Sequence, residues 1–193
     1  MLNAAKRDTN KVKLFNDLAS KYISINNTVK ATSYADSSEL LATALYYKTG
    51  KANAIVLKGQ AESKKGNREN AVGKYKLAAN LYHELGDKTA EANTFTSIAG
   101  EYAQKDNYVE ALRYRHAAMK LYEELNNKDG LMRTFLGIGS VYGNLANYPE
   151  AMKYFFTVLK MAKEAGNKNI IAGALRNLSV LYQYENNLKA SYN

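Results

Sequence analysis

Apolar positions along this chain recur at an interval of 40 residues. Ala71, Ala111 and Ala151 are three successive members of one such series. Further series with the same offset are Asn27, Asn67, Asn107, Asn147 and Asn187; Tyr102, Tyr142 and Tyr182; and the small residues Ala19, Gly59, Ala99, Gly139 and Ser179. So many matches in one register indicate an internal repeat.

Each repeat unit predicts two helices. In the third unit Phe95, Ile98, Ala99 and Tyr102 are spaced by three, one and three residues, which places them on one face of an α-helix. After the polar turn 105–107, a second amphipathic helix is indicated by Ala111, Leu112, Tyr114, Ala118, Leu121 and Leu125. Since one helix pair cannot bury its apolar face alone, we expect the pairs to stack.

The residues between the predicted helices have the chemistry of helix ends. Asn107 and Asn147 stand where second helices begin, each with a glutamate three residues later, so we expect capping boxes in which Asn and Glu satisfy free N–H groups. The second helices should end at Gly86, Asn126 and Gly166, because Gly and Asn tolerate the left-handed conformation. Asp87, Asn127 and Asn167 then cap the helices that follow.

These boundaries predict a single array over residues 1–193. Its units are 11–50, 51–90, 91–130, 131–170 and a partial unit, 171–193, whose second helix begins near Leu188. In the second unit Lys58 and Glu62 occupy two normally apolar positions, which predicts looser packing there. The partial unit lacks the apolar rows that would close the stack, so we expect a longer protein or pairing through that end.

Composition excludes several classes of protein. Hydrophobic residues make up 46% of the chain, there is one proline, and cysteine is absent, so disulfides and thiolate metal sites are ruled out. The most apolar stretch, 132–145, is too short for a membrane span and contains Arg133 and Asn144. No signal peptide is visible at the start. The sequence is compatible with both a cytoplasmic and a periplasmic location.

No constellation of residues predicts catalysis. The two histidines, His83 and His116, are 33 residues apart and out of phase with the repeat, so a shared metal or catalytic site is not expected. The glycine-rich stretch 137–143 has the wrong spacing for a phosphate-binding loop and falls within a predicted helix. We therefore expect no enzymatic activity from this chain, no cofactor and no metal.

The repeat resembles the tetratricopeptide repeat (TPR) in a 40-residue form. The fourth unit carries the family's order of large–small, aromatic, loop, alanine–large, aromatic and small at Ile138–Gly139, Tyr142, 146–148, Ala151–Met152, Phe155 and Val158. The third unit matches it from Ile98 to Leu112, with Arg115 in place of the usual aromatic residue. The resemblance implies an all-α, right-handed superhelical solenoid of antiparallel helix pairs, a scaffold for protein binding.

A narrower resemblance concerns the beginning of the chain. Asp8–Thr9, the stretch 11–19 and the stretch 47–52 are similar to N-terminal repeat regions of bacterial signalling proteins, in which such arrays precede histidine kinases or other output domains. This resemblance implies a sensory or regulatory segment of a bacterial signal-transduction protein.

The family likeness also implies a site, because in TPR proteins the first helix of each pair lines a concave groove. Asn and Gln can pair with both N–H and C=O groups of an extended peptide, and Arg133 can hold a carboxylate. The mapped groove positions are Asn53, Gln60, Lys64, Asn93, Ser97, Gln104, Arg133, Ser140, Asn144 and Asn177, together with Leu57, Gly100, Gly137 and Tyr184.

Two other functions stay open. The first is a dimerisation or spacer module, an alternative that rests on the uncapped C-terminal end of the array. A formal charge of +9 and interleaved Tyr and Lys residues would also allow contact with nucleic acid. The lysines are spread without a dense block, however, which is typical of a solvated helical exterior.

Overall fold

The structure, a computed structural model, describes residues 2–191, with side chains for residues 8–184. Over residues 2–191 it consists of α-helices joined by tight turns, without a strand, which confirms the predicted all-α class. The chain divides into two compact units, Met1–Glu101 and Tyr102–Asn193. The single array expected over residues 1–193 stays a prediction.

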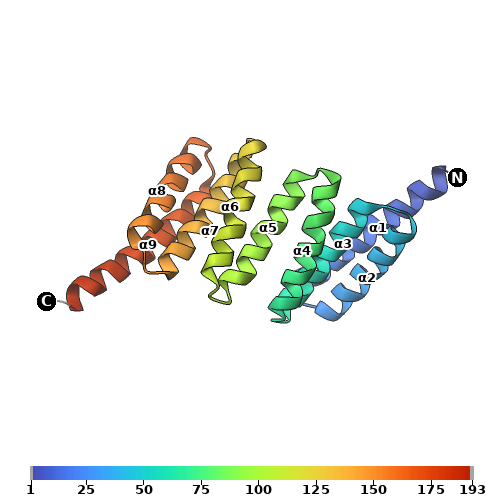
Figure 1. The fold of residues 1–193 in the computed structure, drawn as a ribbon, viewed down its shortest axis with the longest axis horizontal. Helices are drawn as coiled ribbons and strands as arrows, with labels where there is room; N and C mark the ends of the chain where they lie inside the picture. Colours follow the sequence, from blue (N-terminus) through green and yellow to red (C-terminus); the bar gives the residue numbers. More distant parts are fainter. Residues whose placement is uncertain (1, 192–193) are drawn as a thin grey trace. The chain divides into compact units, whose positions relative to one another are not determined.

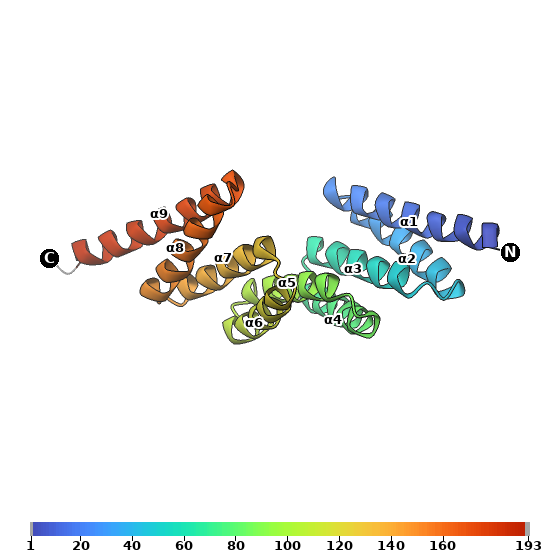
Figure 2. The same ribbon diagram turned by 90° about the horizontal axis from the view of Figure 1, so that it is seen from above.

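Each unit is a stack of helices that contact their neighbours in the sequence. The first holds α1 (Leu2–Ser24), α2 (Thr28–Ala44), α3 (Lys48–Lys64), α4 (Arg68–Leu85) and most of α5 (Lys88–Ala103). The second holds α6 (Tyr108–Glu124), α7 (Lys128–Asn144), α8 (Tyr148–Glu164) and α9 (Lys168–Ser191). Besides the helices next to them in sequence, α1 also contacts α3, and α7 also contacts α9 (Figures 1 and 2).

The turns recur every 20 residues and share one geometry. The residue that closes each helix has a positive φ, and the next residue donates its N–H to the carbonyl five residues earlier, as Asn107 does to Tyr102 at 3.0 Å. This is the Schellman arrangement that ends helices. The positive-φ positions are Asn26, Tyr46, Gly66, Gly86, Asp106, Asn126, Ala146 and Gly166. The predicted helix ends at Gly86, Asn126 and Gly166 are confirmed.

The predicted N-caps are also present, but the prediction of reciprocal capping boxes is wrong. The Oδ1 atoms of Asn107 and Asn147 accept the N–H of Glu110 and Glu150, at 3.2 and 3.4 Å. The backbone N–H that a capping-box glutamate would bind is already donated to the preceding helix by the Schellman turn. The carboxylate of Glu150 instead accepts from Lys153, 3.1 Å away. Asp87, Asn127 and Asn167 cap their helices as expected.

The core rests on small residues that lie beneath aromatic rings. A Cβ built on Gly59 would stand 2.6 Å from the ring of Tyr75, and one on Gly139 would stand 2.6 Å from Phe155, so only glycine fits without movement. Ala71, Ala111 and Ala151 are all fully buried, as is expected of equivalent positions. Residues that lie 40 positions apart therefore occupy equivalent packing environments.

Polar contacts replace apolar ones in the second unit of the repeat, where looser packing was expected. Lys58 Nζ lies 2.6 Å from Asp36 Oδ1 and 3.0 Å from Glu39 Oε2. Burial is the largest single influence on the pKa of Lys58 and lowers it, but the hydrogen bonds and charges of both carboxylates together raise the net pKa. The Glu62 carboxylate accepts from Lys65 at 2.7 Å and from Asn67 at 2.8 Å.

The helix start expected near Leu188 is not formed. Helix α9 runs without a break from Lys168 to Ser191, through Asn187. In the earlier repeats a residue with positive φ closes the helix one position before the equivalent asparagine, as Asp106 and Ala146 do. Here the helix continues through Asn187.

Candidate functional site

A cleft of about 600 Å³ opens within the C-terminal unit, between α7, α8 and α9. Two loops complete it: the turn that leads into α6 and the turn between α7 and α8. Its lining residues are Asp106, Tyr108, Ser140, Gly143, Asn144, Ala146, Tyr148, Phe155, Asn177, Val180, Leu181 and Tyr184.

Helical spacing places the lining residues of α7 on one face of that helix, and those of α9 on one face of theirs. Ser140, Gly143 and Asn144 on α7 are separated by three and one residues, which puts them on one face of the helix. On α9, Asn177, Val180, Leu181 and Tyr184 follow the same rule. At Gly143 an added Cβ would stand 3.4 Å from Leu181 Cδ2, an ordinary van der Waals contact, which shows how closely α9 packs on α7 here.

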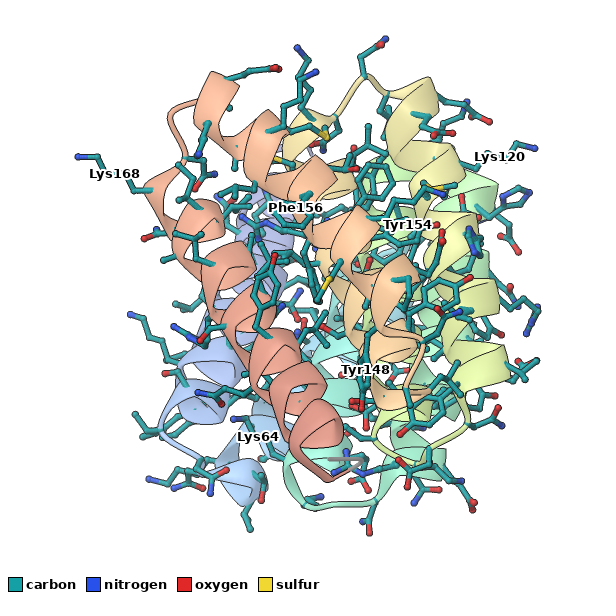
Figure 3. All side chains as sticks on the ribbon, turned by 90° about the vertical axis from the view of Figure 1, so that its left-hand side faces the viewer. Lys64, Lys120, Tyr148, Tyr154, Phe156 and Lys168 are labelled. Carbon is teal, nitrogen blue, oxygen red and sulfur yellow. The ribbon has the colours of Figure 1, made fainter. Side chains whose placement is uncertain are left out.

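Aromatic rings form the wall on the side of α8. Tyr148 and Tyr184 stack with their ring centroids 6.1 Å apart and their planes 6° apart. Figure 3 shows Tyr148 at the start of α8, on the side of α9. With the buried Phe155, these rings give the cleft an apolar surface opposite the amides of Asn144 and Asn177.

One carboxylate is held at the rim by a tyrosine. The Tyr108 hydroxyl donates to Asp106 Oδ1 at 2.6 Å. That hydrogen bond is the main reason why the pKa of Tyr108 is raised, with smaller contributions from burial and the Asp106 charge, while a hydrogen bond with Asn144 lowers it. Among the described lining residues, Asp106 is the one that belongs to the Asp, Glu, Lys and Arg types. The cleft therefore offers amide and hydroxyl groups, aromatic faces and one anion.

The structure gathers part of the predicted groove. Ser140, Asn144, Asn177 and Tyr184 line the cleft together. Gln104 and Arg133 belong to the same unit and are exposed, but they do not line it.

The other candidates lie in the N-terminal unit. Asn53 accepts a hydrogen bond from the Tyr82 hydroxyl at 2.6 Å, and Ser97 Oγ donates to the carbonyl of Asn93 at 3.2 Å. Gln60 is half-buried and Lys64 is exposed; Lys64 is labelled in Figure 3. These residues are accessible, and their role in binding stays a prediction.

Two mapped positions are wrong as groove positions. Leu57 is buried in a cluster with Ala19, Ile23 and Ala31, because its side chain packs against the preceding helix pair. Gly137 lies under the guanidinium of Arg115, since an added Cβ would overlap Arg115 Cζ. The arginine that replaces the usual aromatic residue therefore reaches across to α7 and fills this space.

The sequence mapping missed the contribution of second helices to the cleft. Tyr108 and Tyr148 each follow an N-cap asparagine and are 40 residues apart, so the repeat register contained a signal for both. Because only first helices were expected to line the groove, Phe155 on α8 was not among the predicted site residues. Asp106 and Ala146 enter the site through the positive-φ turns.

Other chemistry is sparse in the part of the chain that the structure describes. Within residues 8–184, no group of three or more His, Cys, Asp or Glu residues is placed to hold a metal ion. His83 Nδ1 lies 3.1 Å from Glu91 Oε1, while His116 is exposed on α6. None of the described helices is both long enough and apolar enough to pass through a bilayer.

Solved structures of helical repeat proteins resemble this chain. Aspartyl phosphate phosphatase F from Bacillus subtilis aligns with a TM-score of 0.84 at 16% identity, over 89% of this chain and 45% of its own. A signal transduction ATPase with a tetratricopeptide repeat sensor, from Pyrococcus horikoshii, gives 0.82 at 19% identity, over 91% and 27%. A Rap protein complexed with competence and sporulation factor gives 0.73 at 16% identity, over 90% and 54%.

These likenesses establish the fold, a TPR-type helical repeat, as the sequence resemblance implied. The chain spans less than half of the Bacillus phosphatase and about a quarter of the Pyrococcus ATPase. No family model matches the sequence, and no curated protein matches it as a relative.

Proposed function

We propose that this chain is a binding scaffold that holds a polypeptide segment in the cleft of its C-terminal unit. The observation that carries the proposal is the meeting of Ser140, Asn144 and Asn177 with the stacked Tyr148 and Tyr184 in one cleft. Amides can bond to both N–H and C=O groups of a peptide, and aromatic faces bury its side chains. About 600 Å³ suffices for a few residues of an extended segment.

The charge of the cleft indicates what kind of segment it accepts. Asp106 retains a carboxylate oxygen beyond the one that Tyr108 binds. A lysine or arginine of the ligand can pair with it, whereas an acidic residue would be repelled. We therefore expect a segment that places one apolar residue against the rings and one basic residue at the rim.

The fold neighbours support this assignment and its place in signalling. One of them is a Rap protein complexed with competence and sporulation factor, and another carries a tetratricopeptide repeat sensor. We propose that this chain is likewise the sensory or regulatory segment of a bacterial signal-transduction protein. It acts by binding, and no catalytic step is assigned to it.

A peptide array screened with the full chain tests the cleft. Peptides that bind are then titrated by fluorescence anisotropy against wild type, Asn144→Ala and Asn177→Ala. We expect each substitution to weaken binding about tenfold, since each removes hydrogen bonds to the ligand. Asn80→Ala, an exposed amide on α4, is the matched control and should bind as wild type does. Equal affinity of all four proteins would rule the cleft out.

A second candidate function, dimerisation, is favoured by the outer face of α9. Leu175, Ser179 and Tyr182 are exposed there. At the equivalent positions of α7, Phe135 and Tyr142 each lie 5.8 Å from the ring of Tyr154, and Gly139 lies under Phe155. Helix α8 thus covers the equivalent stripe of α7, so we expect the stripe of α9 to be suited to packing against a helix. We propose that the occupant is α9 of a second copy.

Antiparallel pairing about Ser179 places Leu175 of one copy opposite Tyr182 of the other, and the small serine lets the helices approach. Sedimentation equilibrium of the full chain tests this. We expect a concentration-dependent dimer that Ser179→Arg abolishes, while Thr157→Arg on the exposed face of α8 leaves it intact. A wild-type monomer at about 0.5 mM, a concentration at which even weak specific pairs form, would remove this candidate.

A further inference from the structure

Stacked tyrosines join the two helices of a pair at three places in the repeat. Tyr22 stacks on Tyr34 with ring centroids 5.5 Å apart, and Tyr102 on Tyr114 and Tyr142 on Tyr154 do so at 5.8 Å. The planes of each pair lie within 15° of each other. In each case the second tyrosine comes 12 residues after the first, and the pairs fall in the 40-residue register. The stack is therefore a regular part of this repeat.

The second helix pair breaks this rule. In the same register it has Glu62 on α3 and Lys74 on α4. Glu62 turns toward Lys65 and Asn67, at 2.7 and 2.8 Å. Gly73, the neighbour of Lys74, adds no side chain, and an added Cβ would meet no atom within 4 Å. Two rings are thus absent from a place where the other pairs have them, and no side chain fills the space fully.

A pocket of about 520 Å³ occupies this place. It lies between α2, α3 and α4, all within the N-terminal unit, and is separate from the C-terminal cleft. Its lining residues are Thr32, Lys58, Glu62, Glu69, Asn70, Gly73, Lys74 and Leu77. The pocket combines an apolar side chain, Leu77, with hydrogen-bonding groups, two ammonium groups and the carboxylates of Glu62 and Glu69. Both glutamates have partners of their own.

The two lysines of the pocket differ in their partners. Lys58 is paired with both Asp36 and Glu39. Lys74 is half-buried, and it has no hydrogen bond or ion pair among the side chains that the structure describes. A charge withdrawn from water gains free energy when an opposite charge reaches it. The ammonium of Lys74 is therefore ready to receive an anion.

We propose that this pocket binds a small aromatic carboxylate. The ring occupies the space of the missing tyrosine pair, against Leu77 and the side-chain methylenes of Lys58, and the carboxylate pairs with Lys74. The Thr32 hydroxyl donates to the Thr28 carbonyl and can accept a hydrogen bond from a polar substituent of the ring, while the Asn70 amide can donate one. An ammonium close to the ring face adds a cation–π contribution. A phenol with an acidic arm matches this space better than an aliphatic acid does, because tyrosines fill it in the other repeats.

Calorimetric titration of the full chain with 4-hydroxyphenylacetate tests the proposal. We expect saturable binding to the wild type, loss of about tenfold or more in affinity in Lys74→Met, and no change in Lys120→Met, which alters an exposed lysine of α6. Acetate, which lacks the ring, and p-cresol, which lacks the carboxylate, should each bind at least tenfold more weakly than the probe.

A second variant keeps the test independent of any damage to the fold. Glu62→Tyr combined with Lys74→Tyr restores the pair found in the other repeats, and should raise the melting temperature while abolishing binding of the probe. Binding that persists in this filled variant or in Lys74→Met, or a wild type that does not respond at about 10 mM probe, would overturn the proposal. Neither result bears on the peptide cleft, whose residues belong to the other unit.

Discussion

At the scale of single residues, backbone conformation and burial decide more than side-chain type. Tyr46 and Ala146 have φ values of 54° and 56°, a region that L-residues with a Cβ adopt at a cost of about 1 kcal/mol. Tyr46 is also 93% exposed, so little packing compensates for that cost. The turn keeps its geometry because the helices on both sides are packed.

Replacement of Tyr46 by glycine should therefore stabilise the protein. We expect Tyr46→Gly to raise the free energy of unfolding by about 1 kcal/mol in urea titrations, since glycine adopts positive φ without steric cost. Gly86→Ala, at φ 68°, is the reciprocal variant and should lower it by a similar amount. If both substitutions shift the unfolding midpoint in the same direction, the turn geometry is not the cause.

A buried tyrosine makes stability depend on alkaline pH. Burial, aided by the charge of Asp87, raises the pKa of Tyr82 from 10.0 to about 12. The unfolded chain loses this proton first, so the native state loses stability as the pH rises from about 10 to 12. The raised pKa of Lys58 acts in the same direction, because its ion pairs persist only while it is protonated.

The slope of this loss can be measured in urea titrations between pH 9 and 12. We expect Tyr82→Phe to be less stable by about 1 kcal/mol at pH 7, where it lacks the hydrogen bond to Asn53. Above pH 10 the free energy of unfolding of Tyr82→Phe should fall less steeply than that of the wild type, by up to about 1.4 kcal/mol per pH unit. Parallel curves for the two proteins would mean that Tyr82 does not contribute.

At the scale of elements, the repeat makes each helix begin and end in nearly the same way. Of the helices α2 to α9, six begin with a side-chain cap, among them α7, whose cap Asn127 accepts the Gly130 N–H at 2.9 Å. The two without one are α3, which follows Tyr47, and α4, where the Asn67 side chain donates to Glu62 instead. A single polar substitution in one helix thus changes the start of the next.

Removal of an N-cap side chain should destabilise the protein, and another capping residue at the same position should recover the lost stability. We expect Asn127→Ala to lower the free energy of unfolding by about 1 kcal/mol, and Asn127→Asp or Asn127→Ser to recover most of it. Circular dichroism during urea unfolding provides the measurement. An equal loss in the alanine and serine variants would show that packing at this turn matters and the cap does not.

At the scale of the molecule, stability comes from contacts between neighbours. In the first unit contacts join α1 to α2 and α3, α2 to α3, and α3 to α4; in the second they join α6 to α7, α7 to α8 and α9, and α8 to α9. Such an array transmits stability from pair to pair and lacks a single central core. Local damage is then expected to stay local.

Hydrogen exchange followed by mass spectrometry tests this expectation. Gly139→Ala forces a methyl group against the ring of Phe155 and should destabilise α7, α8 and α9 by about 1–3 kcal/mol. Exchange should quicken in these helices far more than in α1 to α4. Gly100→Ala, where an added Cβ meets no atom within 4 Å, is the control. A uniform increase over the whole chain would show that both units unfold together.

The order of residues along the chain was enough to predict helices α2 to α8, their 40-residue register and their polar ends. These depend on local spacing and on residues such as Asn107 and Gly86, whose preferences act within a few positions. It also placed Ser140, Asn144 and Asn177 on an accessible face. The burial of Leu57, the reach of Arg115 to Gly137 and the joining of Tyr148 with Tyr184 in a cleft were decided by the tertiary structure alone. Each of these depends on which helices pack together, and periodicity along one helix does not specify its neighbours across space.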